Sequence, residues 1–310
     1  MYNPLGLPSG FFCPQRRLST TKKIKMERLS IAVQKSGRLQ EGSLELLKKC
    51  GISVDSGNGQ LKVSCADFPL EVLFLRNSDI PQYVQDGVAD IAIIGGNLLE
   101  ESDEDVQIIE SLGFSKCRVS IAVPKSGQIK SLSDLNGKKI ATSYPNTLQK
   151  FLDKKGINAE IHTISGSVEI APNIGLAEGI CDIVSSGNTL FMNGLRELEV
   201  ILRSEAVLIA NKSLSAEKQR LVDQLLFRIR AVQAAKTNKY VLLNAPVAAL
   251  DKITEILPGV KSPTILPLAD KEWVSVHSVI NENRFWEVID QLREAGAQGI
   301  LIVPIEKMVV

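Results

Sequence analysis

The segment GVADI at residues 87–91 has a counterpart in GICDI at residues 179–183, and each copy follows a helical stretch and leads into a strand and a glycine turn. Two copies of one strand-and-turn unit predict two similar α/β lobes. The segment SLSDLNGKK (131–139) is expected to lead into the second lobe, and the strand AVLIA (206–210) to return the chain to the first. Such a hinged pair is expected to bind its ligands in a cleft at the carboxyl ends of the strands.

Short apolar runs alternate with helical periods through the first two thirds of the chain. The strands expected there are LSIAV (29–33), LEVLFL (70–75), DIAIIG (90–95), VSIAV (119–123), KIATS (139–143), DIVSS (182–186) and AVLIA (206–210). A helix with apolar residues at Leu39, Leu44 and Leu47 follows the first strand and ends at Gly51. Most of these runs are short and rich in Ile and Val, which is typical of buried parallel strands.

A different order of elements follows a long helix that is expected from Ser215 to about Lys236. The pattern then predicts strand 240–243, helix 247–257, strand 264–268, strand 273–280, helix 284–295 and strand 299–303, with Pro258, Gly259, Pro263 and Gly296 at the turns. This βαββαβ order is that of a ferredoxin-like domain.

These patterns give a domain division. The first lobe takes residues 26–124 and 203–236, the second lobe residues 125–202, and the third domain residues 237–310. Residues 1–25 hold three prolines, two arginines and no acidic residue, and we interpret them as a disordered leader, with a transit peptide as the alternative.

Charge and composition exclude several classes of protein. The chain has 36 basic and 35 acidic residues and a net charge of +1, so no global field draws it to nucleic acid or to an anionic membrane. No apolar run reaches the roughly 18 residues of a membrane-spanning helix. The five cysteines are scattered and lack the spacing of metal ligands or of a redox pair, which favours a reducing, cytoplasmic location. Any anion must therefore be bound by local groups.

The sharpest local motif is DIVSSGNTL (182–190), in which an apolar strand ends in two hydroxyl residues, a glycine and a further hydroxyl residue before a helix begins. Several backbone N–H groups and a helix N-terminus then point into one concavity, which binds phosphate without net charge. Asp182 is expected at the strand end, where its carboxylate accepts hydrogen bonds from sugar hydroxyls. A plain turn with Thr189 as the helix N-cap is the alternative.

A wider pattern connects this loop with a known family. From Glu169 through Gly175, Ala177, Ile180 and Asp182 to Leu190, the sequence resembles the signature of the ATP phosphoribosyltransferases. The resemblance extends over QKSGRL (34–39), LRNSDIP (75–81), GKKIATSYP (137–145), GSVEIAP (166–172), SPTILPL (262–268) and IVPIEKM (302–308). The third domain makes the chain similar to the long, self-regulated form of the family, and only residues 1–25 have no counterpart.

The resemblance implies a fold, a reaction and a regulation. The expected fold is α/β, with a bilobal, periplasmic-binding-protein-like catalytic body and a C-terminal ferredoxin-like regulatory domain. The expected reaction transfers the phosphoribosyl group of phosphoribosyl pyrophosphate to N1 of ATP, with Mg²⁺ on the departing pyrophosphate, and opens histidine biosynthesis. Histidine is expected to inhibit through the third domain, and the chain is expected to form dimers and hexamers.

The residues expected to bind the substrates follow the ends of strands. Phosphoribosyl pyrophosphate is assigned to Asp182, Ser185, Ser186, Gly187, Asn188, Thr189 and Leu190, and ATP to Lys35, Gly37, Arg38, Arg76, Gly95 and Tyr144. A reaction of this kind needs positioning and charge stabilisation rather than a covalent nucleophile. Asp182 and Glu169 are therefore expected to face the developing positive charge, and Arg38 to hold polyphosphate.

Other interpretations of these residues stay open. The basic loop 35–38 can be a solvated helix cap, Arg76 can pair with Asp79, and Tyr144 can serve packing alone. Histidine is assigned to Asn244, Ala245 and Thr264, which ordinary turn chemistry explains equally well.

Two other classes of protein share this plan. Periplasmic solute-binding proteins also have two lobes and close over a ligand without any reaction, but they require a secretory signal. Another phosphoribosyl or nucleotide-binding enzyme on the same frame is the third possibility, and release of pyrophosphate from ATP plus phosphoribosyl pyrophosphate would separate all three.

Overall fold

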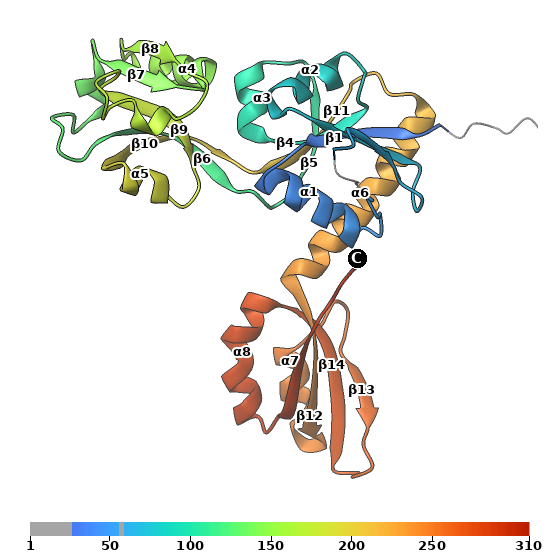
Figure 1. Ribbon diagram of the computed structural model, residues 1–310. Coiled ribbons are helices and arrows are strands. Elements are labelled where there is room, and N and C mark those ends of the chain that lie inside the picture. Colours follow the sequence, from blue (N-terminus) through green and yellow to red (C-terminus); the bar gives the residue numbers. More distant parts are fainter. Residues whose placement is uncertain (1–26, 56–58, 310) are drawn as a thin grey trace, which may run out of the picture.

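The computed structural model describes residues 27–55 and 59–309, so the expected leader 1–25 lies outside the described residues. Two α/β lobes lie side by side, and a third domain lies at the far end of the long helix α6 (Figure 1). The expected α/β fold class, with a bilobal body and a ferredoxin-like C-terminal domain, is confirmed.

The first lobe is built on a six-stranded sheet with the order β2-β3-β1-β4-β11-β5. Its strands are β1 (Leu29–Gln34), β2 (Lys62–Ser64), β3 (Leu70–Leu75), β4 (Ile91–Gly95), β5 (Gln107–Ser111) and β11 (Ala206–Ala210). Its helices are α1 (Arg38–Lys49), η1 (Asn77–Asp79), α2 (Ile80–Gln85), α3 (Gly96–Ser102) and α6 (Ala216–Thr237). Only the β3–β1 and β1–β4 pairings of this sheet are parallel, whereas the β2–β3, β4–β11 and β11–β5 pairings are antiparallel.

Successive side chains of β1 are buried on opposite faces of this sheet, as strand geometry requires. Ile31 and Val33 pack in one cluster with residues of α1 and α6, whereas Ala32 packs in another cluster with residues of α2. Helices therefore cover both faces, and the ends of the parallel strands are left for a site.

The second lobe has a five-stranded sheet with the order β10-β6-β9-β7-β8. Its elements are β6 (Cys117–Pro124), η2 (Leu132–Leu135), β7 (Lys139–Thr142), α4 (Pro145–Lys155), β8 (Glu160–Thr163), η3 (Val168–Ile170), β9 (Gly179–Val184), α5 (Asn188–Met192) and β10 (Leu195–Ser204). The sheet includes β6 and all of β10, so the expected boundaries at residues 125 and 202 miss strands that belong to this lobe. The apolar pattern of β6 identifies a buried strand, but it does not identify the sheet in which that strand pairs.

The repeated segments 87–91 and 179–183 lead to helices that begin at equivalent positions, but their strands end at different positions. Gly96 and Asn188 occupy the same position in the two copies, and each is the first residue of a helix. In the first lobe residues 93–95 still pair with β11, whereas in the second lobe residues 185–187 have left the sheet. The expected strand 182–186 is in fact β9 (179–184), so the glycine loop is a strand end that has been released from pairing.

The third domain has the expected βαββαβ order. Its elements are β12 (Asn238–Pro246), η4 (Val247–Ala249), α7 (Leu250–Ile256), β13 (Thr264–Pro267), β14 (Trp273–Asn281), α8 (Glu282–Glu294) and β15 (Gln298–Pro304), in a sheet ordered β13-β14-β12-β15. Phe285 and Leu292 of α8 pack on Val241 and Val276 of the sheet. α6, with 22 residues and a length of about 33 Å, joins this domain to the first lobe (Figure 1).

A buried ion pair gives a test of the first lobe. Asp90, 4% exposed, accepts hydrogen bonds from the Ser30 backbone N–H and hydroxyl (both 2.8 Å) and pairs with Lys218 Nζ at 2.7 Å. Asp90→Ala is expected to lower the free energy of unfolding by about 3 kcal/mol, because it leaves the ammonium partly buried without its partner.

The measurement is hydrogen exchange of β1 and β4 amides, since both tryptophans lie in the third domain. Asp105→Ala is the matched control, because Asp105 pairs with Lys212 at the surface and such pairs contribute about 1 kcal/mol at most. Equal losses in the two variants would contradict a buried, stabilising role for Asp90.

Candidate active site

The cationic residues of the predicted ATP site lie at one edge of the first lobe. Lys35 follows β1, Arg38 is the first residue of α1, and Arg76 follows β3, so all three stand at the carboxyl ends of adjacent parallel strands. All three are exposed. Among residues 27–55 and 59–309, no hydrogen bond or ion pair engages their side chains, so all three remain available to an anion; in particular, the alternative Arg76–Asp79 pair is not formed.

Glycine shapes this edge at two places. Gly37 has φ +93° between β1 and α1, a left-handed backbone that favours glycine and turns the chain sharply into the helix. Gly95 ends β4, and a Cβ there would lie 2.5 Å from Asn97 Oδ1. Glycine is therefore favoured by the backbone conformation at Gly37 and by the nearby Asn97 side chain at Gly95.

The glycine loop lies at the carboxyl end of β9 in the second lobe. Ser185, Ser186, Asn188 and Thr189 are exposed, and Gly187 has φ +85° as the residue before α5. Leu190 is buried and anchors the helix. The loop is thus open to solvent, with the Asn188 backbone N–H donating to Ser186 Oγ at 3.4 Å, and Thr189 lies inside α5 rather than at its N-cap.

The predicted acidic pair lies beside this loop. Asp182 is half-buried, and its Oδ1 accepts a hydrogen bond from the Ile183 backbone N–H at 2.8 Å. Burial raises the pKa of Asp182, and the neighbouring Glu169 carboxylate, carried by η3, raises it further. The structure therefore brings Asp182 and Glu169 together, although Asp182 lies two residues before the end of β9 and not at the strand end.

Tyr144 connects the two predicted substrate sites. It precedes α4 at the carboxyl end of β7, and its hydroxyl accepts a hydrogen bond from Asn97 Nδ2 of the first lobe at 3.0 Å. Burial raises the pKa of Tyr144, and the Asp182 carboxylate contributes to the same direction. The phenol therefore stays protonated, close to the acidic pair and at the contact between the two lobes.

The three residues assigned to histidine divide between two faces of the third domain. Asn244 lies opposite Ser275 in β14, and Thr264 lies opposite His277 two residues away, so both point to the sheet face that α7 and α8 leave open. Ala245 is fully buried in the helix-covered core. Its side chain cannot join the other two, because neighbouring strand residues point to opposite faces.

Sequence reasoning missed two residues that organise the site. Arg118 donates from Nη1 to the Ser185 carbonyl at 3.0 Å and from Nε to Glu197 Oε2 at 2.8 Å, which ties the glycine loop to β6 and β10. Asn97 holds Tyr144. Arg118 and Ser185 are 67 positions apart in the chain, and Asn97 and Tyr144 are 47 positions apart, so no local sequence pattern reveals either contact.

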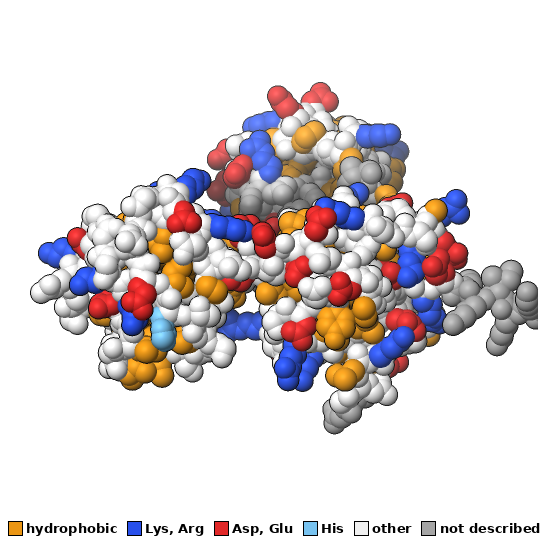
Figure 2. All heavy atoms as spheres, turned by 90° about the horizontal axis from the view of Figure 1, so that it is seen from above, with side chains coloured by type: hydrophobic (Ala, Val, Ile, Leu, Met, Phe, Trp, Pro, Cys, Tyr) orange, Lys and Arg blue, Asp and Glu red, His pale blue; other side chains and the backbone are white. Residues whose placement is uncertain are grey.

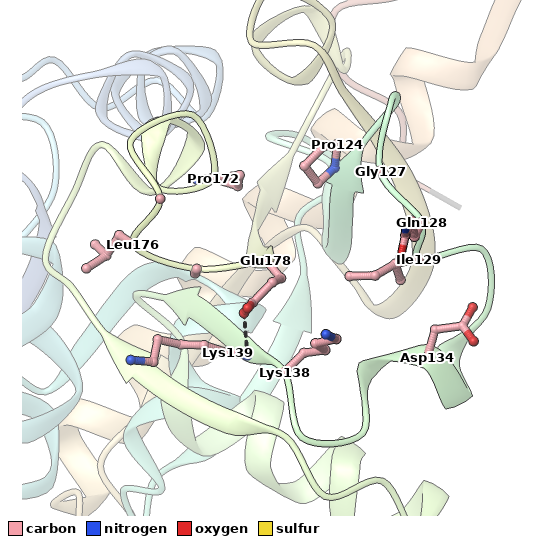
Figure 3. A pocket seen from close by; sticks show the side chains of 12 residues that line it. Pro124, Gly127, Gln128, Ile129, Asp134, Lys138, Lys139, Pro172, Leu176 and Glu178 are labelled. Carbon is pink, nitrogen blue, oxygen red and sulfur yellow. Dashed lines mark hydrogen bonds between the residues drawn. The ribbon is translucent and has the colours of Figure 1, made fainter.

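A hollow of the second lobe lies at the end of its sheet opposite to the glycine loop. A pocket of about 730 Å³ is formed where β7 and β9 begin and β6 ends (Figure 3). Glu178 there already accepts a hydrogen bond from the Lys139 backbone N–H at 2.8 Å. We do not assign the reaction to this pocket, because the glycine loop and the acidic pair are at the other end of β9.

On the face seen in Figure 2, basic and acidic side chains are interspersed over the lobes. Within the described residues no three His, Cys, Asp or Glu side chains gather as a metal site. None of the described helices has the length and apolar character to cross a membrane.

The fold and the site define a two-lobed α/β protein with a glycine loop, an acidic pair and a separate ferredoxin-like domain. The family described as ATP phosphoribosyltransferase matches residues 76–231, and the C-terminal domain of the same family matches residues 235–307. ATP phosphoribosyltransferases of Cytophaga hutchinsonii and Parabacteroides distasonis are each 57% identical over 91% of this chain and over 98% and 100% of their own length.

Solved structures agree with these matches. The ATP phosphoribosyltransferase (HisG:HisZ) complex from Thermotoga maritima contains a chain that is 30% identical, with a TM-score of 0.57 over 65% of this chain and 96% of its own. Tv2483 bound to L-arginine, 13% identical with a TM-score of 0.50, covers 68% of this chain and 87% of its own, and shares the fold alone. The chain belongs to the ATP phosphoribosyltransferase family, and it is a pentosyltransferase of the first step of histidine biosynthesis.

The acidic pair predicts a pH dependence. Glu169→Gln removes a negative charge that raises the pKa of Asp182, so the ionised form of Asp182 persists to lower pH. The acid limb of the profile of kcat/KM against pH is expected to move to lower pH. The limb should move only in part, because burial, the larger cause of the raised pKa of Asp182, is unchanged.

Initial rates across the acid range measure this shift. Glu178→Gln, at the far end of the second sheet, removes the same charge and should leave the limb in place. If the acid limb moves equally in both variants, the ionisation of Asp182 does not determine that limb.

Proposed function

We propose that the enzyme transfers the phosphoribosyl group of phosphoribosyl pyrophosphate to N1 of ATP and releases pyrophosphate. The observation that carries this proposal is the half-buried acidic pair Asp182 and Glu169 beside the glycine loop, together with three uncommitted cations on the other lobe. The loop takes the 5′-phosphate of the sugar, and the cations take the triphosphate. We assign the catalytic roles to the lobes and the regulatory role to the third domain.

The geometry suggests how these groups divide the reaction. The adenine N1 bonds to C1 of the ribose as the bond from C1 to the pyrophosphate oxygen breaks, so positive charge grows on the ring between them. Asp182 and Glu169 stabilise this charge and hold ribose hydroxyls, while the protonated Tyr144 lines the adenine side. Preorganised charge of this kind supplies catalysis without a covalent intermediate.

Magnesium fits this arrangement as a partner of the substrate. Mg²⁺ prefers oxygen ligands and keeps several waters, so one or two carboxylates and the pyrophosphate oxygens suffice to hold it. Asp182 and Glu169 are the residues that would contribute. When bound, the ion neutralises charge on the departing pyrophosphate.

An absorbance assay for phosphoribosyl-ATP, with ATP, phosphoribosyl pyrophosphate and Mg²⁺, tests the proposal. Asp182→Asn is expected to lower turnover by about 100-fold, the loss typical of a removed electrostatic group. Turnover within about threefold of the parent would contradict the role of Asp182. Absence of product from folded parent protein would contradict the reaction itself.

Histidine inhibition through the third domain is the regulatory part of the proposal. Asn244 and Thr264 share the open sheet face, where Tyr240 and Ser275 flank His277 at 2.9 and 3.1 Å. The amide, hydroxyl and imidazole groups of this face are suited to bind a small zwitterion. Homodimers and hexamers and a cytoplasmic location belong to the same proposal.

Substitution on the open face tests the histidine site. Asn244→Ala and Thr264→Val are each expected to raise the histidine concentration for half inhibition roughly tenfold, the effect of one lost hydrogen bond of about 1.4 kcal/mol. The assay above, run over a histidine series, gives this value. Asn283→Ala, on the exposed start of α8, is the control, and unchanged inhibition in both open-face variants would move the histidine site elsewhere.

A further inference from the structure

The two lobes touch through α3 of the first lobe and α4 of the second, beside the cleft. α3 begins directly after β4, and two residues separate the end of β7 from the start of α4. Each helix therefore starts at the carboxyl edge of its sheet, where the substrates are placed. The contact between these helices is the part of the lobe interface nearest to the proposed reaction.

Asn97 marks the hinge end of this contact. Its backbone N–H donates to Ser204 Oγ at 2.8 Å, and its Oδ1 accepts from the same hydroxyl at 3.0 Å. Ser204 ends β10, and Cys117, whose Sγ lies 3.9 Å from Asn97 Oδ1, begins β6. One side chain thus touches both strands that cross between the lobes, and it is only 4% exposed.

Glu101 lies one turn farther along α3 and reaches into the other lobe. Its two carboxylate oxygens accept hydrogen bonds from the backbone N–H groups of Asn146 and Thr147, each at 2.9 Å. Its carbonyl accepts from Asn146 Nδ2 at 2.9 Å. Because Tyr144, the N-cap residue of α4, makes no side-chain cap, Glu101 caps this helix from the opposite lobe.

The contact continues outward to the surface. Lys150, one turn into α4, lies 3.1 Å from Asp103 and 3.8 Å from Glu100, and all three side chains are exposed. Such surface pairs contribute little by themselves. The contacts therefore run in a line from the hinge at Asn97, through Glu101, to the periphery, and rotation about the hinge separates Glu101 from α4 before it disturbs Asn97.

We propose that Glu101 is the latch of the two lobes: a positioning residue that, by capping α4 across the cleft, holds the closed arrangement in which both substrates are bound. Opening the cleft breaks its two bonds to α4 and leaves the helix N-terminus to water. This inference rests on the proposed function for its kinetic consequence, but the latch itself is a property of the protein without substrate.

The latch predicts a particular division of kinetic effects. Glu101→Gln removes the charge and replaces one acceptor oxygen by a donor, so the closed fraction of the free enzyme falls. Apparent affinity falls with the fraction that is competent to bind. We expect KM for ATP and for phosphoribosyl pyrophosphate to rise by the same factor, about 3 to 10, with kcat at saturation within twofold of the parent.

Glu100→Gln is the matched control. It removes the same charge from the neighbouring position of α3, where the exposed carboxylate lies 3.8 Å from Lys150 farther along α4 but does not touch the start of that helix. Both KM values should stay within twofold of the parent. Glu101→Ala should exceed Glu101→Gln in effect, because it removes both acceptor oxygens.

Hydrogen exchange of the full-length protein without substrates tests the latch independently of activity. The amides of Asn146 and Thr147 should exchange at least tenfold faster in Glu101→Gln, and at the parental rate in Glu100→Gln. Unchanged exchange would overturn the latch even if the enzyme is active. Lower KM values in Glu101→Gln would also overturn it, because they would mean that the carboxylate competes with an anionic substrate. An inactive parent with faster exchange in the variant would reject the proposed reaction and keep the latch.

Discussion

The antiparallel ladder between β6 and β10 is the constraint on which the arrangement of the site depends. Both passages of the chain between the lobes lie in this ladder, whose pairs run from Cys117 with Ser204 to Arg196 with Val123 and Leu195 with Pro124. Two strands joined side by side bend together about one axis more easily than they twist apart. The two carboxyl edges therefore approach each other along one path, and Asn97 lies at its origin.

Local groups explain how a chain of nearly zero net charge could bind the two polyanions of the proposed reaction. Lys35, Arg38 and Arg76 are uncommitted on the first lobe, whereas the glycine loop of the second offers neutral donors. The acidic pair lies on the side of the neutral donors, where burial holds the pKa of Asp182 above its usual range. Cations and carboxylates are thus separated onto different lobes, and they do not neutralise each other before a substrate arrives.

The sequence predicts those elements whose pattern is set by burial. β1, β3, β4 and β11 are apolar because both faces of their sheet are covered, and each lies within a residue or two of its expected range. β5 (QIIES) and β8 (EIHT) lie at sheet edges, where exposure weakens the pattern, and both were missed. The glycine loop could likewise be predicted from the order of its residues, because a turn depends on residues that are close together in the chain.

What the sequence could not reveal depends on partners that are distant along the chain. Whether VSIAV pairs in the first or the second sheet is decided by β9 and β10, which lie more than fifty residues later. The position of Asp182 within β9 depends on which residues leave the ladder, and the opposite orientation of Ala245 arises because β12 continues to Pro246, beyond the expected end at residue 243. Arg118, Asn97 and Glu101 belong to the same class, since each acts only through a contact between separate elements.

The third domain is attached to the catalytic body through α6, which is also part of the core of the first lobe. Arg228 of α6 donates to the Cys50 carbonyl after α1 at 3.1 Å, and Gln233 donates to the Ser111 carbonyl at the end of β5 at 2.7 Å. Beyond these anchors, α6 continues into β12, and the C-terminal segment returns to it through the Met308 backbone N–H, which donates to the Ala231 carbonyl at 2.9 Å. A rotation of the third domain is therefore applied to a helix that packs with α1, the helix whose first residue is Arg38. The regulation that we propose for this domain would need no separate relay, because α6, which carries the domain, also packs with α1 at one edge of the site.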